Sequence, residues 1–291
     1  MSVACPETAL AAGDWAARRA AHRARAGALT AARLARTSAG RADPVEDFLF
    51  TYYPFRPAAL ARWSPGWGVD LEGEPPAGET WWEPAPGGRF RVAAAERDPK
   101  ALVRVRFIRE LCLAVAARPA YHGCFGLHEW AMVYRSAEAR RHAAWPLRLG
   151  PDGTDAVVES MPVRCTHFDA FRFFTPEARP LNRASPDLAG RVDNEQPGCV
   201  HANMDLYKWA MKLGPLAPAE LAADAFDLAA DARRVDMRAS PYDFRAAGLE
   251  PIAIETPEGR ADYEREQRRL AAAAAPIRRR LIVACDRILA G

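Results

Sequence analysis

Lysine is almost absent from this chain of 291 residues: three of its 40 basic residues are lysines, and all the others are arginines. Arginine fills most positions that need only a positive charge, so a retained lysine weakly indicates that a primary amine is wanted there. Two of the three, Lys208 and Lys212, lie one helical turn apart and closely follow His201 and Asp205. This segment is therefore the first candidate for a functional site.

Other absences exclude whole classes of protein. No apolar run approaches the roughly 20 residues that a membrane-spanning helix needs. The first residues carry Glu7 and lack a basic start, so we expect no signal peptide. The six cysteines are spread along the chain without a CxxC pair, which favours free thiols in a cytoplasmic protein. A net charge of +3 permits nucleic-acid binding without indicating it.

The apolar content of 49% is enough for a sizeable core. We expect an α+β protein: a mainly α-helical single domain with a small antiparallel sheet or hairpin. Residues 1–42 form an Arg/Ala-rich helical segment, with Asp14 as the N-cap of its helix, and residues 43–291 form a mainly helical catalytic domain. The oligomeric state is left open.

Hydrophobic periodicity and turn residues place the elements. A helix is predicted after Asp43, with Pro44 at its first position and Glu46 completing a capping box. Further helices are predicted over residues 100–120, 125–136, 203–213, 220–237 and 261–289, the second of them buried and the last interrupted at Pro276. Strands are predicted at 89–94 and 164–174, and a hairpin at 145–160, where Pro-Asp-Gly reads as the turn.

The helix that contains the two lysines carries a polar stripe. At about 100° per residue, Asp205, Lys208 and Lys212 lie within about 40° of His201 on the helical wheel. His201, Asp205 and Lys208 could transfer protons, and a buried Lys208 could attack as an amine. The alternative is a solvent-facing stripe in which Asp205 and Lys208 form an ordinary ion pair.

Two further segments combine histidine with a carboxylate. His128 and Glu129 are adjacent in the helix expected to be buried, where a carboxylate needs a partner, a metal ion or a proton. If residues 164–174 are extended, His167 and Asp169 project from the same face. Glu129 could equally be held by a structural arginine.

Three of the histidines closely follow a cysteine, in the pairs Cys124/His128, Cys165/His167 and Cys199/His201. Cysteine and neutral histidine are ligands for zinc, and histidine with carboxylates also suits non-haem iron. One reading is therefore a metal site for zinc or iron, with ligands from His128, Glu129, His167, Asp169, His201 and Asp205. In the other reading the cysteines are small packing residues.

Aromatic residues crowd the same segments. They are either core residues or the walls of a pocket that stacks a flat ligand. The candidates for substrate binding are Trp130, Tyr134, Phe171, Phe173, Tyr207, Trp209 and the nearby amide of Asn203.

Seven segments from Asp43 onward resemble an actinobacterial family commonly catalogued as 3-methyladenine DNA glycosylase: DPVEDFLFTYY, GCFGLHEWAMVYR, AAWPLRLGPDGTDAVVE, THFDAFRFFTPEARPLN, QPGCVHANMDLYKWAMKL, DMRASPYDF and ETPEGRADYE. The resemblance implies a DNA N-glycosylase, a hydrolase of DNA repair that excises alkylated purines. The chain has no helix-hairpin-helix signature, so the resemblance implies an activity without identifying the residues of a site.

Cleavage of an N-glycosidic bond passes through an oxocarbenium-like state that a carboxylate stabilises, and the base needs an aromatic pocket. Asp205, Glu129 or Asp169 could supply the carboxylate, and Lys208 could attack the sugar. DNA would be the partner, held by arginines, and no cofactor is needed. The alternative is a metal-dependent oxidase or hydrolase that uses zinc or iron on a small-molecule substrate.

Overall fold

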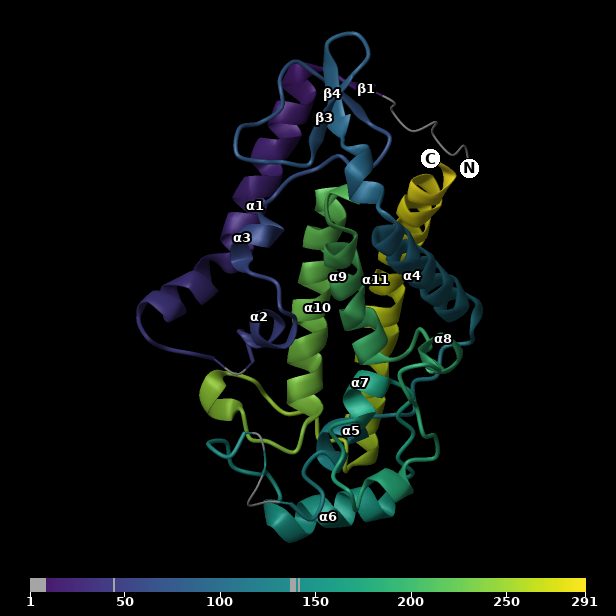
Figure 1. Ribbon diagram of the computed structural model, residues 1–291. Coiled ribbons are helices and arrows are strands. Elements are labelled where there is room, and N and C mark those ends of the chain that lie inside the picture. Colours follow the sequence, from purple (N-terminus) through teal and green to yellow (C-terminus); the bar gives the residue numbers. More distant parts are fainter. Residues whose placement is uncertain (1–8, 44, 137–139, 141) are drawn as a thin grey trace.

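Four long helices build the body of the protein. The computed structural model describes residues 9–43, 45–136, 140 and 142–291. Helices α9 (Val200–Leu213) and α10 (Ala219–Ala239) pack side by side, α11 (Pro257–Ala290) packs along both, and α4 (Pro99–Ala117) packs against α11 (Figure 1). These four helices confirm the prediction of a mainly helical chain.

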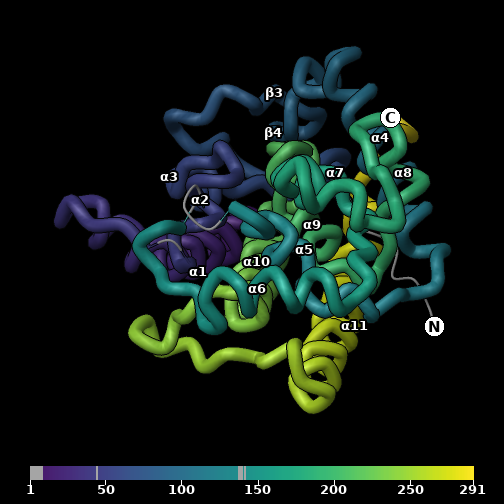
Figure 2. The backbone as a smooth tube through the Cα atoms, turned by 90° about the horizontal axis from the view of Figure 1, so that it is seen from below, coloured from purple at the N-terminus to yellow at the C-terminus, as the bar shows by residue number. Residues whose placement is uncertain are grey.

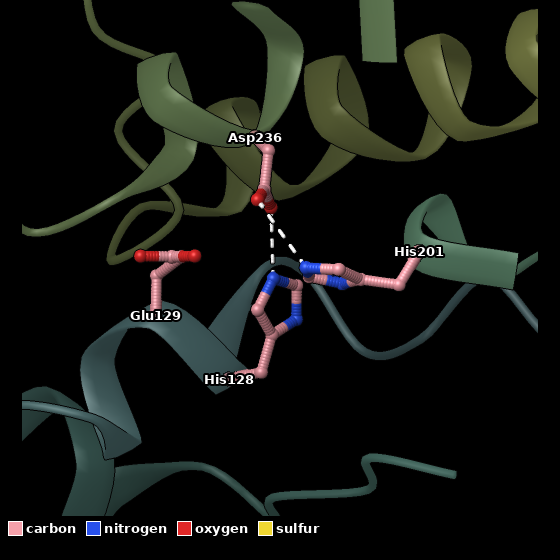
Figure 3. A group of neighbouring side chains, drawn as sticks. All are labelled: His128, Glu129, His201 and Asp236. Atoms are coloured by element: carbon pink, nitrogen blue, oxygen red, sulfur yellow. Dashed lines mark hydrogen bonds and ion pairs between the residues drawn. The ribbon is translucent and has the colours of Figure 1, made fainter. Parts of the chain in front are cut away.

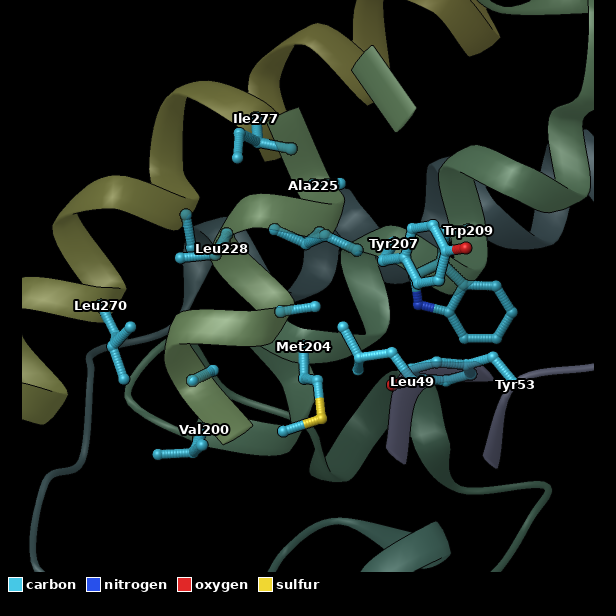
Figure 4. Close-up of a cluster of buried hydrophobic side chains, with 14 of the residues drawn as sticks. Leu49, Tyr53, Val200, Met204, Tyr207, Trp209, Ala225, Leu228, Leu270 and Ile277 are labelled. Atoms are coloured by element: carbon cyan, nitrogen blue, oxygen red, sulfur yellow. The ribbon is translucent and has the colours of Figure 1, made fainter. Parts of the chain in front are cut away.

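The core lies between α9, α10 and α11 because each presents a face of large apolar side chains. Met204 and Tyr207 of α9 are fully buried, and Leu270 of α11 meets the same cluster (Figure 4). Leu49 and Tyr53 close this core from the side of α2 (Phe48–Tyr52). Each fully buried side chain of this size contributes roughly 1.5–3 kcal/mol to stability, so the bundle holds its polar contents in a rigid frame.

Helix α11 runs through Pro276, and the predicted interruption there is wrong. Proline removes one backbone hydrogen bond of the helix. Pro276 is exposed, so the carbonyl that loses its donor can bind water instead. Buried residues continue at helical spacing on both sides of the proline and pack against the neighbouring helices: Leu270, Ala274, Ile277 and Leu281.

Helix α1 (Ala12–Ser38) lies against α10 and α3 (Pro57–Leu60). The buried ring of His22 is hydrogen-bonded to the carbonyl of Leu60 at 2.8 Å. The prediction that Asp14 is the N-cap is wrong, because the helix begins at Ala12 and Asp14 lies inside its first turn. In the first turn, the negative charge of Asp14 still interacts favourably with the positive end of the helix dipole. The division of the chain at residue 43 stays a prediction.

The start of the next segment also differs from the expectation. Asp43 accepts hydrogen bonds from the backbone N–H groups of Val45 and Glu46, but helix α2 begins later, at Phe48. Glu46 does not complete a capping box, because its carboxylate pairs with Arg234 of α10 at 2.9 Å. Pro44 lies outside the described residues.

A small sheet covers one end of the bundle (Figure 1). Its strand order is β1-β2-β4-β3, with β1 and β2 parallel and the other pairs antiparallel, so the sheet is mixed. Gly87 and Gly88 both have positive φ in the turn between β3 and β4. The predicted strand at 89–94 is confirmed as β4. The strands are Ala9–Leu10 (β1), Asp70–Glu72 (β2), Trp82–Ala85 (β3) and Arg89–Val92 (β4).

The hairpin predicted at 145–160 is wrong. Residues Gly150–Ser160 form helix α6, in which Pro151 occupies the first turn and Asp152 complements its dipole. Pro-Asp-Gly therefore starts a helix here instead of making a strand turn. The buried residues of α6 follow a helical spacing: Thr154, Val157 and Val158. The hairpin prediction had interpreted this pattern as the alternation of a strand.

The strand predicted at 164–174 is also wrong, because the chain forms the short helix α7 (Phe168–Phe171) there. His167 directly precedes this helix and Asp169 lies in its first turn, so they do not share the face of a strand. Helix α5 (Leu127–Ala131) is buried at every residue, which confirms the expected buried helix.

Short elements complete the lower end of the molecule, where α5 and α6 lie across the ends of the long helices (Figures 1 and 2). In the described part of the chain, no helix is long and apolar enough to cross a membrane. The remaining elements are α8 (Arg191–Asn194) and four 3-10 turns: η1 (Ala94–Arg97), η2 (Arg179–Leu181), η3 (Gly214–Leu216) and η4 (Arg245–Ala247).

Candidate metal centre

Two histidines and two carboxylates meet in the interior near α5. His128 and Glu129 come from α5, His201 from α9 and Asp236 from α10. Each offers one ligand atom, and these atoms all lie within 4.8 Å of one another. In Figure 3 the Asp236 carboxylate faces both imidazoles, and Glu129 extends from the α5 side. We call these four residues the His–carboxylate group.

Gly126 allows α5 to reach this position. Its φ of 72° is left-handed, and a Cβ atom there would lie 3.2 Å from the Cβ of Ala239 at the end of α10. The indole of Trp130 then donates a hydrogen bond to the Ala239 carbonyl at 2.8 Å. This close approach of α5 to α10 brings His128 against Asp236.

Protonation differs sharply between the two histidines. His128 Nε2 is hydrogen-bonded to Asp236 at 2.8 Å. Burial alone would lower the pKa of His128, but Asp236 raises it well above its ordinary value. Burial and the nearby His128 lower the pKa of His201 to about 3, so His201 is a neutral imidazole at physiological pH. A neutral imidazole is the form that binds metal ions.

The two carboxyl groups are also tuned in opposite directions. Burial alone would raise the pKa of Asp236, but His128 holds it well below its ordinary value. Burial, followed by the charge of Asp236, raises the pKa of Glu129 to about 7. Glu129 can therefore exchange a proton near neutral pH, while Asp236 stays ionised.

Two buried polar atoms of this group have no hydrogen-bond partner among the described residues: Nδ1 of His201 and Oδ2 of Asp236. Leaving such an atom unsatisfied costs roughly 1–3 kcal/mol. Imidazole nitrogens and carboxylate oxygens are ligands for zinc and for non-haem iron. The donor set and the unsatisfied Nδ1 of His201 fit a bound divalent ion, which would share the two carboxylates with Arg233, 3.7 Å from Glu129 and from Oδ2 of Asp236.

A second buried group lies beside the first and contains its own cation. His167, Glu195 and Asp205 offer ligand atoms within 4.8 Å of one another. The guanidinium of Arg191 donates to Glu195 at 2.8 Å and to Asp205 at 2.7 Å, and it lies 3.4 Å from His167. Lys208 adds a contact of 2.5 Å to Asp205. Side-chain cations thus fill this group, and we call it the Arg191 group.

Asp205 is held from several sides. It accepts a hydrogen bond from the hydroxyl of Tyr53 at 2.7 Å besides those from Arg191 and Lys208. Burial alone would raise the pKa of Asp205, but Lys208, His167 and Arg191 lower it well below its ordinary value. Lys208 also donates to Asp169 at 3.0 Å. These contacts make Asp205 and Lys208 an ion pair inside the protein.

His201 connects the two groups. Its ring centroid lies 4.5 Å from that of His128, nearly perpendicular, and 5.4 Å from that of His167, nearly parallel. The three histidines singled out in the sequence therefore converge in space. All six predicted metal ligands lie in or next to these groups, with Asp169 bound to both Arg191 and Lys208.

A pocket of about 50 Å³ opens onto this region. That volume has room for roughly three or four water molecules. Glu129, Asp169, His201 and Arg233 contribute its polar surface. The aromatic part of its wall comes from Phe48, Tyr52, Phe173, Tyr242 and the ring of His142. The pocket thus combines aromatic side chains with the carboxylates of Glu129 and Asp169.

The predicted polar stripe of α9 faces the interior along most of its length. His201, Asp205 and Lys208 are buried, whereas Lys212 is half-buried and lies over the ring of Trp209 at 5.4 Å. The stripe is therefore not a solvent face, because it supplies His201 to the first buried group and Asp205 and Lys208 to the second.

Most of the aromatic candidates lie elsewhere. Of those named from the sequence, Phe173 lines the described pocket. Tyr134 donates its hydroxyl to Glu159, and the Asn203 side chain bonds to Pro197 and Arg278. The remaining ones pack in the core or against other rings: Trp130, Phe171, Tyr207 and Trp209.

The cysteines are not part of the site. None of the five described cysteines belongs to either metal-competent group, and all five are free; Cys5 lies outside the described residues. Burial raises the pKa of Cys165 to about 11 and that of Cys199 well above its ordinary value, so both remain thiols. Cys165 donates its thiol to the His167 carbonyl at 3.6 Å.

Four important residues were missed from the sequence: Asp236, Glu195, Arg191 and Arg233. Arg233/Asp236 and Arg191/Glu195 have the i,i+3 and i,i+4 spacings of helical ion pairs. The same spacings occur at the surface, for example in Arg268/Glu264. The local pattern therefore could not separate the buried pairs from the exposed ones.

The site defines a class: a mainly helical protein with a buried group of two histidines and two carboxylates under a small aromatic pocket. Comparison of this chain with models of protein families, with characterised proteins and with solved structures found no match. The geometry of the site must therefore carry the functional inference.

Proposed function

We propose that this protein is a metal-dependent enzyme that acts on a small molecule and binds one divalent ion, zinc or iron. One observation carries the proposal: His128, Glu129, His201 and Asp236 bring four ligand atoms within 4.8 Å of one another. Glu129 and His201 also line the pocket, so a substrate there would meet the centre directly.

The roles of the chain's own residues follow from their contacts. His201 is already neutral, and His128 and Glu129 must give up their protons to bind the ion. Asp236 faces both imidazoles and fixes their orientation. When bound, the ion would polarise a substrate oxygen or lower the pKa of a bound water.

The Arg191 group explains why one ion is proposed and not two. A second ion at His167, Glu195 and Asp205 would have to displace a guanidinium that already binds both carboxylates. Arg191 keeps its charge at any physiological pH, so no proton loss can vacate the position. Arg191 thus takes the place that a second metal would have.

Metal loading of the purified chain tests the proposal. Apo-protein is dialysed against Zn²⁺, or anaerobically against Fe²⁺, and its metal content is measured; we expect one ion per chain. Asp236→Asn should weaken binding at least 10-fold, as the loss of a metal-site carboxylate does. The exposed Asp193→Asn is the matched control and should bind as the wild type does. Equal uptake by both variants, or none by the wild type, would contradict the proposal.

Activity with each metal assigns the reaction class, whereas affinity does not, because zinc binds such ligands more tightly than Fe²⁺ at most sites. Zinc has no redox chemistry and would make the protein a hydrolase. Iron with histidine and carboxylate ligands is typical of oxygen-dependent oxidases. Oxygen uptake by the iron-loaded protein, compared with the zinc-loaded protein, distinguishes the two.

We propose a DNA N-glycosylase as the second candidate, because Glu129 and Asp169 line a pocket with aromatic walls. Glu129 is then the catalytic carboxylate, since Asp205 is held by Tyr53, Arg191 and Lys208. The pocket has room for three or four waters, whereas a purine has nine ring atoms, so the aromatic wall must open. Release of methylated bases from alkylated DNA by the wild type, and its loss in Glu129→Gln, is the expected result; no release at all contradicts it.

The arginines proposed to hold DNA bear on this candidate. Several arginines of α1 are paired with carboxylates of this chain: Arg18 with Glu220, Arg25 with Asp224 and Asp227, and Arg33 and Arg36 with Asp47. Phosphate contacts through these residues would have to compete with these ion pairs. The geometry therefore favours the metal-dependent reading.

A further inference from the structure

We infer that the protein has a second small-molecule site, which binds an α-amino acid with an aromatic side chain. The site is a cavity of about 380 Å³ near the end of the bundle that the small sheet covers. Three polar groups in its wall carry the inference: a guanidinium, a carboxylate and an indole N–H. The inference goes beyond the proposed metal-dependent function and does not depend on it.

The cavity lies where α3 and the segment before β3 meet η3 and the neighbouring ends of α9 and α10 (Figure 1). Small residues leave this space open: Ala59, Ala210, Gly214, Ala217, Ala219 and Ala222. The volume lies within the range of roughly 300–1,000 Å³ that is usual for small-molecule sites. Ala210 follows His201 on α9 by nine residues. At about 1.5 Å per residue, the cavity begins roughly 14 Å along the helix from the His–carboxylate group.

Aromatic side chains form much of the remaining wall: Phe55, Trp63 and Trp81. The two indoles differ in their hydrogen bonds. Trp63 donates its N–H to Glu220 at 3.0 Å. The N–H of Trp81 is buried and has no hydrogen-bond partner among the described residues. Trp81 therefore offers a free donor to a ligand in the cavity.

Arg62 adds a charged donor beside this indole. Its guanidinium lies over the Trp81 ring, 5.5 Å from the ring centroid, and it forms no ion pair within the described part of the chain. A carboxylate can accept hydrogen bonds from a guanidinium and from a neutral N–H at the same time, because its two oxygens provide about four lone-pair sites. Arg62 and Trp81 together therefore suit the carboxylate of a ligand.

Glu96 of η1 provides the opposite charge. It is half-buried in the cavity wall, and its carboxylate has no hydrogen-bond or ion-pair partner in the ranges that the structure describes. Glu96 and Arg62 line the same cavity without pairing with each other. Their charges sum to zero, so a ligand with one ammonium and one carboxylate group neutralises both and leaves no charge in the cavity unpaired.

The rest of the cavity suits the side chain of such a ligand. Phe55, Trp63 and Met211 line it. Aromatic rings and the thioether of methionine pack favourably against another aromatic ring. A zwitterion with an aromatic side chain, such as L-phenylalanine, matches both the charged and the apolar parts of the wall.

Three probes test the inference on the full chain. L-Phenylalanine carries both charges, 3-phenylpropionate lacks the ammonium group, and phenethylamine lacks the carboxylate. Binding of each is measured by titration calorimetry in the presence of a chelator, because amino acids bind zinc. We expect L-phenylalanine to bind roughly 10- to 100-fold more tightly than either analogue, the range for hydrogen bonds to a charged group.

Variants assign each contact. Glu96→Gln should weaken the binding of L-phenylalanine roughly 10-fold or more and leave that of 3-phenylpropionate unchanged. Arg62→Met should weaken both carboxylates and leave phenethylamine unchanged, and Trp81→Phe should do the same to a smaller extent because only a neutral donor is lost. The exposed Glu74→Gln and Arg41→Met are the matched controls and should bind all three probes as the wild type does.

The outcomes separate this inference from the proposed function. Wild-type protein that binds one zinc ion but binds L-phenylalanine no better than its two analogues overturns the inference alone. A preference for L-phenylalanine that survives in both Glu96→Gln and Arg62→Met also overturns it, because the ligand would then bind elsewhere. If a variant does not fold, the comparison of the three probes on the wild type still decides.

Discussion

Replacing Arg191 with glutamine tests whether a side chain holds the place of a second metal ion. Arg191 donates to Glu195 at 2.8 Å, to Asp205 at 2.7 Å and to Asp169 at 3.1 Å. Without it, Asp205 keeps its ion pair with Lys208 and Asp169 keeps those with Lys208 and Arg172, whereas Glu195 loses its ion pair with a guanidinium. Breaking a buried ion pair by removing one partner costs roughly 3–5 kcal/mol.

That cost is measurable by unfolding in the presence of a chelator. For a chain of this length, 1 kcal/mol corresponds to roughly 2 °C in Tm, so Arg191→Gln should lower Tm by roughly 6–10 °C. The exposed Arg183→Gln is the matched control and should unfold as the wild type does. Arg191→Lys keeps a positive charge and should lose less stability.

The number of zinc ions bound by Arg191→Gln then shows whether Arg191 occupies a potential second metal site or only stabilises the fold. With Arg191 removed, His167, Glu195 and Asp205 remain within 4.8 Å of one another and can accept an ion. Arg191→Gln should therefore bind two zinc ions per chain instead of one, and zinc should restore part of the lost Tm. A Tm loss no larger than that of the control, or an unchanged single ion, would refute the reasoning.

Three further variants test other parts of the structure. Asp47→Asn should lower the free energy of unfolding, measured in urea melts at pH 7, by roughly 1–3 kcal/mol. Burial alone would raise the pKa of Asp47, but Arg36 lowers it below its ordinary value of 3.8. The difference in stability between the variant and the wild type should therefore disappear as the pH falls below about 4. Pro276→Ala should stabilise the protein by roughly 1–3 kcal/mol in the same assay, because it restores the donor to the carbonyl of Ala272; an unchanged or lowered stability would contradict an unbroken α11. Gly126→Ala should cost roughly 1–3 kcal/mol and weaken zinc binding, since the residue has φ of 72° and its new Cβ would press on α10; normal stability and zinc affinity would count against the proposed role of this close approach.

Most of the helical frame could be predicted from the sequence because its signals are local. The apolar spacing of α4, α9 and α10 repeats over several turns, and the expected boundaries agree with the observed helices to within a few residues. The failures occurred where a short pattern has two readings. Pro151 and Asp152 can make a hairpin turn or start a helix, and burial of Val157 and Val158 against other elements decided for the helix.

The site could be predicted only in part, for a physical reason. Residue type and spacing identified His128, His167 and His201, and the structure brings them together. Asp236 and Arg233 are common residue types on an amphipathic helix. Only the close approach of α5 to α10 brings them next to His128 and Glu129. Contacts between distant segments are not written in the local pattern of either one.

Anomalous X-ray diffraction from crystals of the zinc- or iron-loaded protein tests the metal centre most directly. We predict one anomalous peak per chain at the metal's absorption edge, enclosed by His128, Glu129, His201 and Asp236. Ligand atoms should lie about 2.0–2.2 Å from it. A peak at any other position, a second peak in the Arg191 group of the wild type, or no peak in protein soaked to saturation would contradict the proposed single-ion centre.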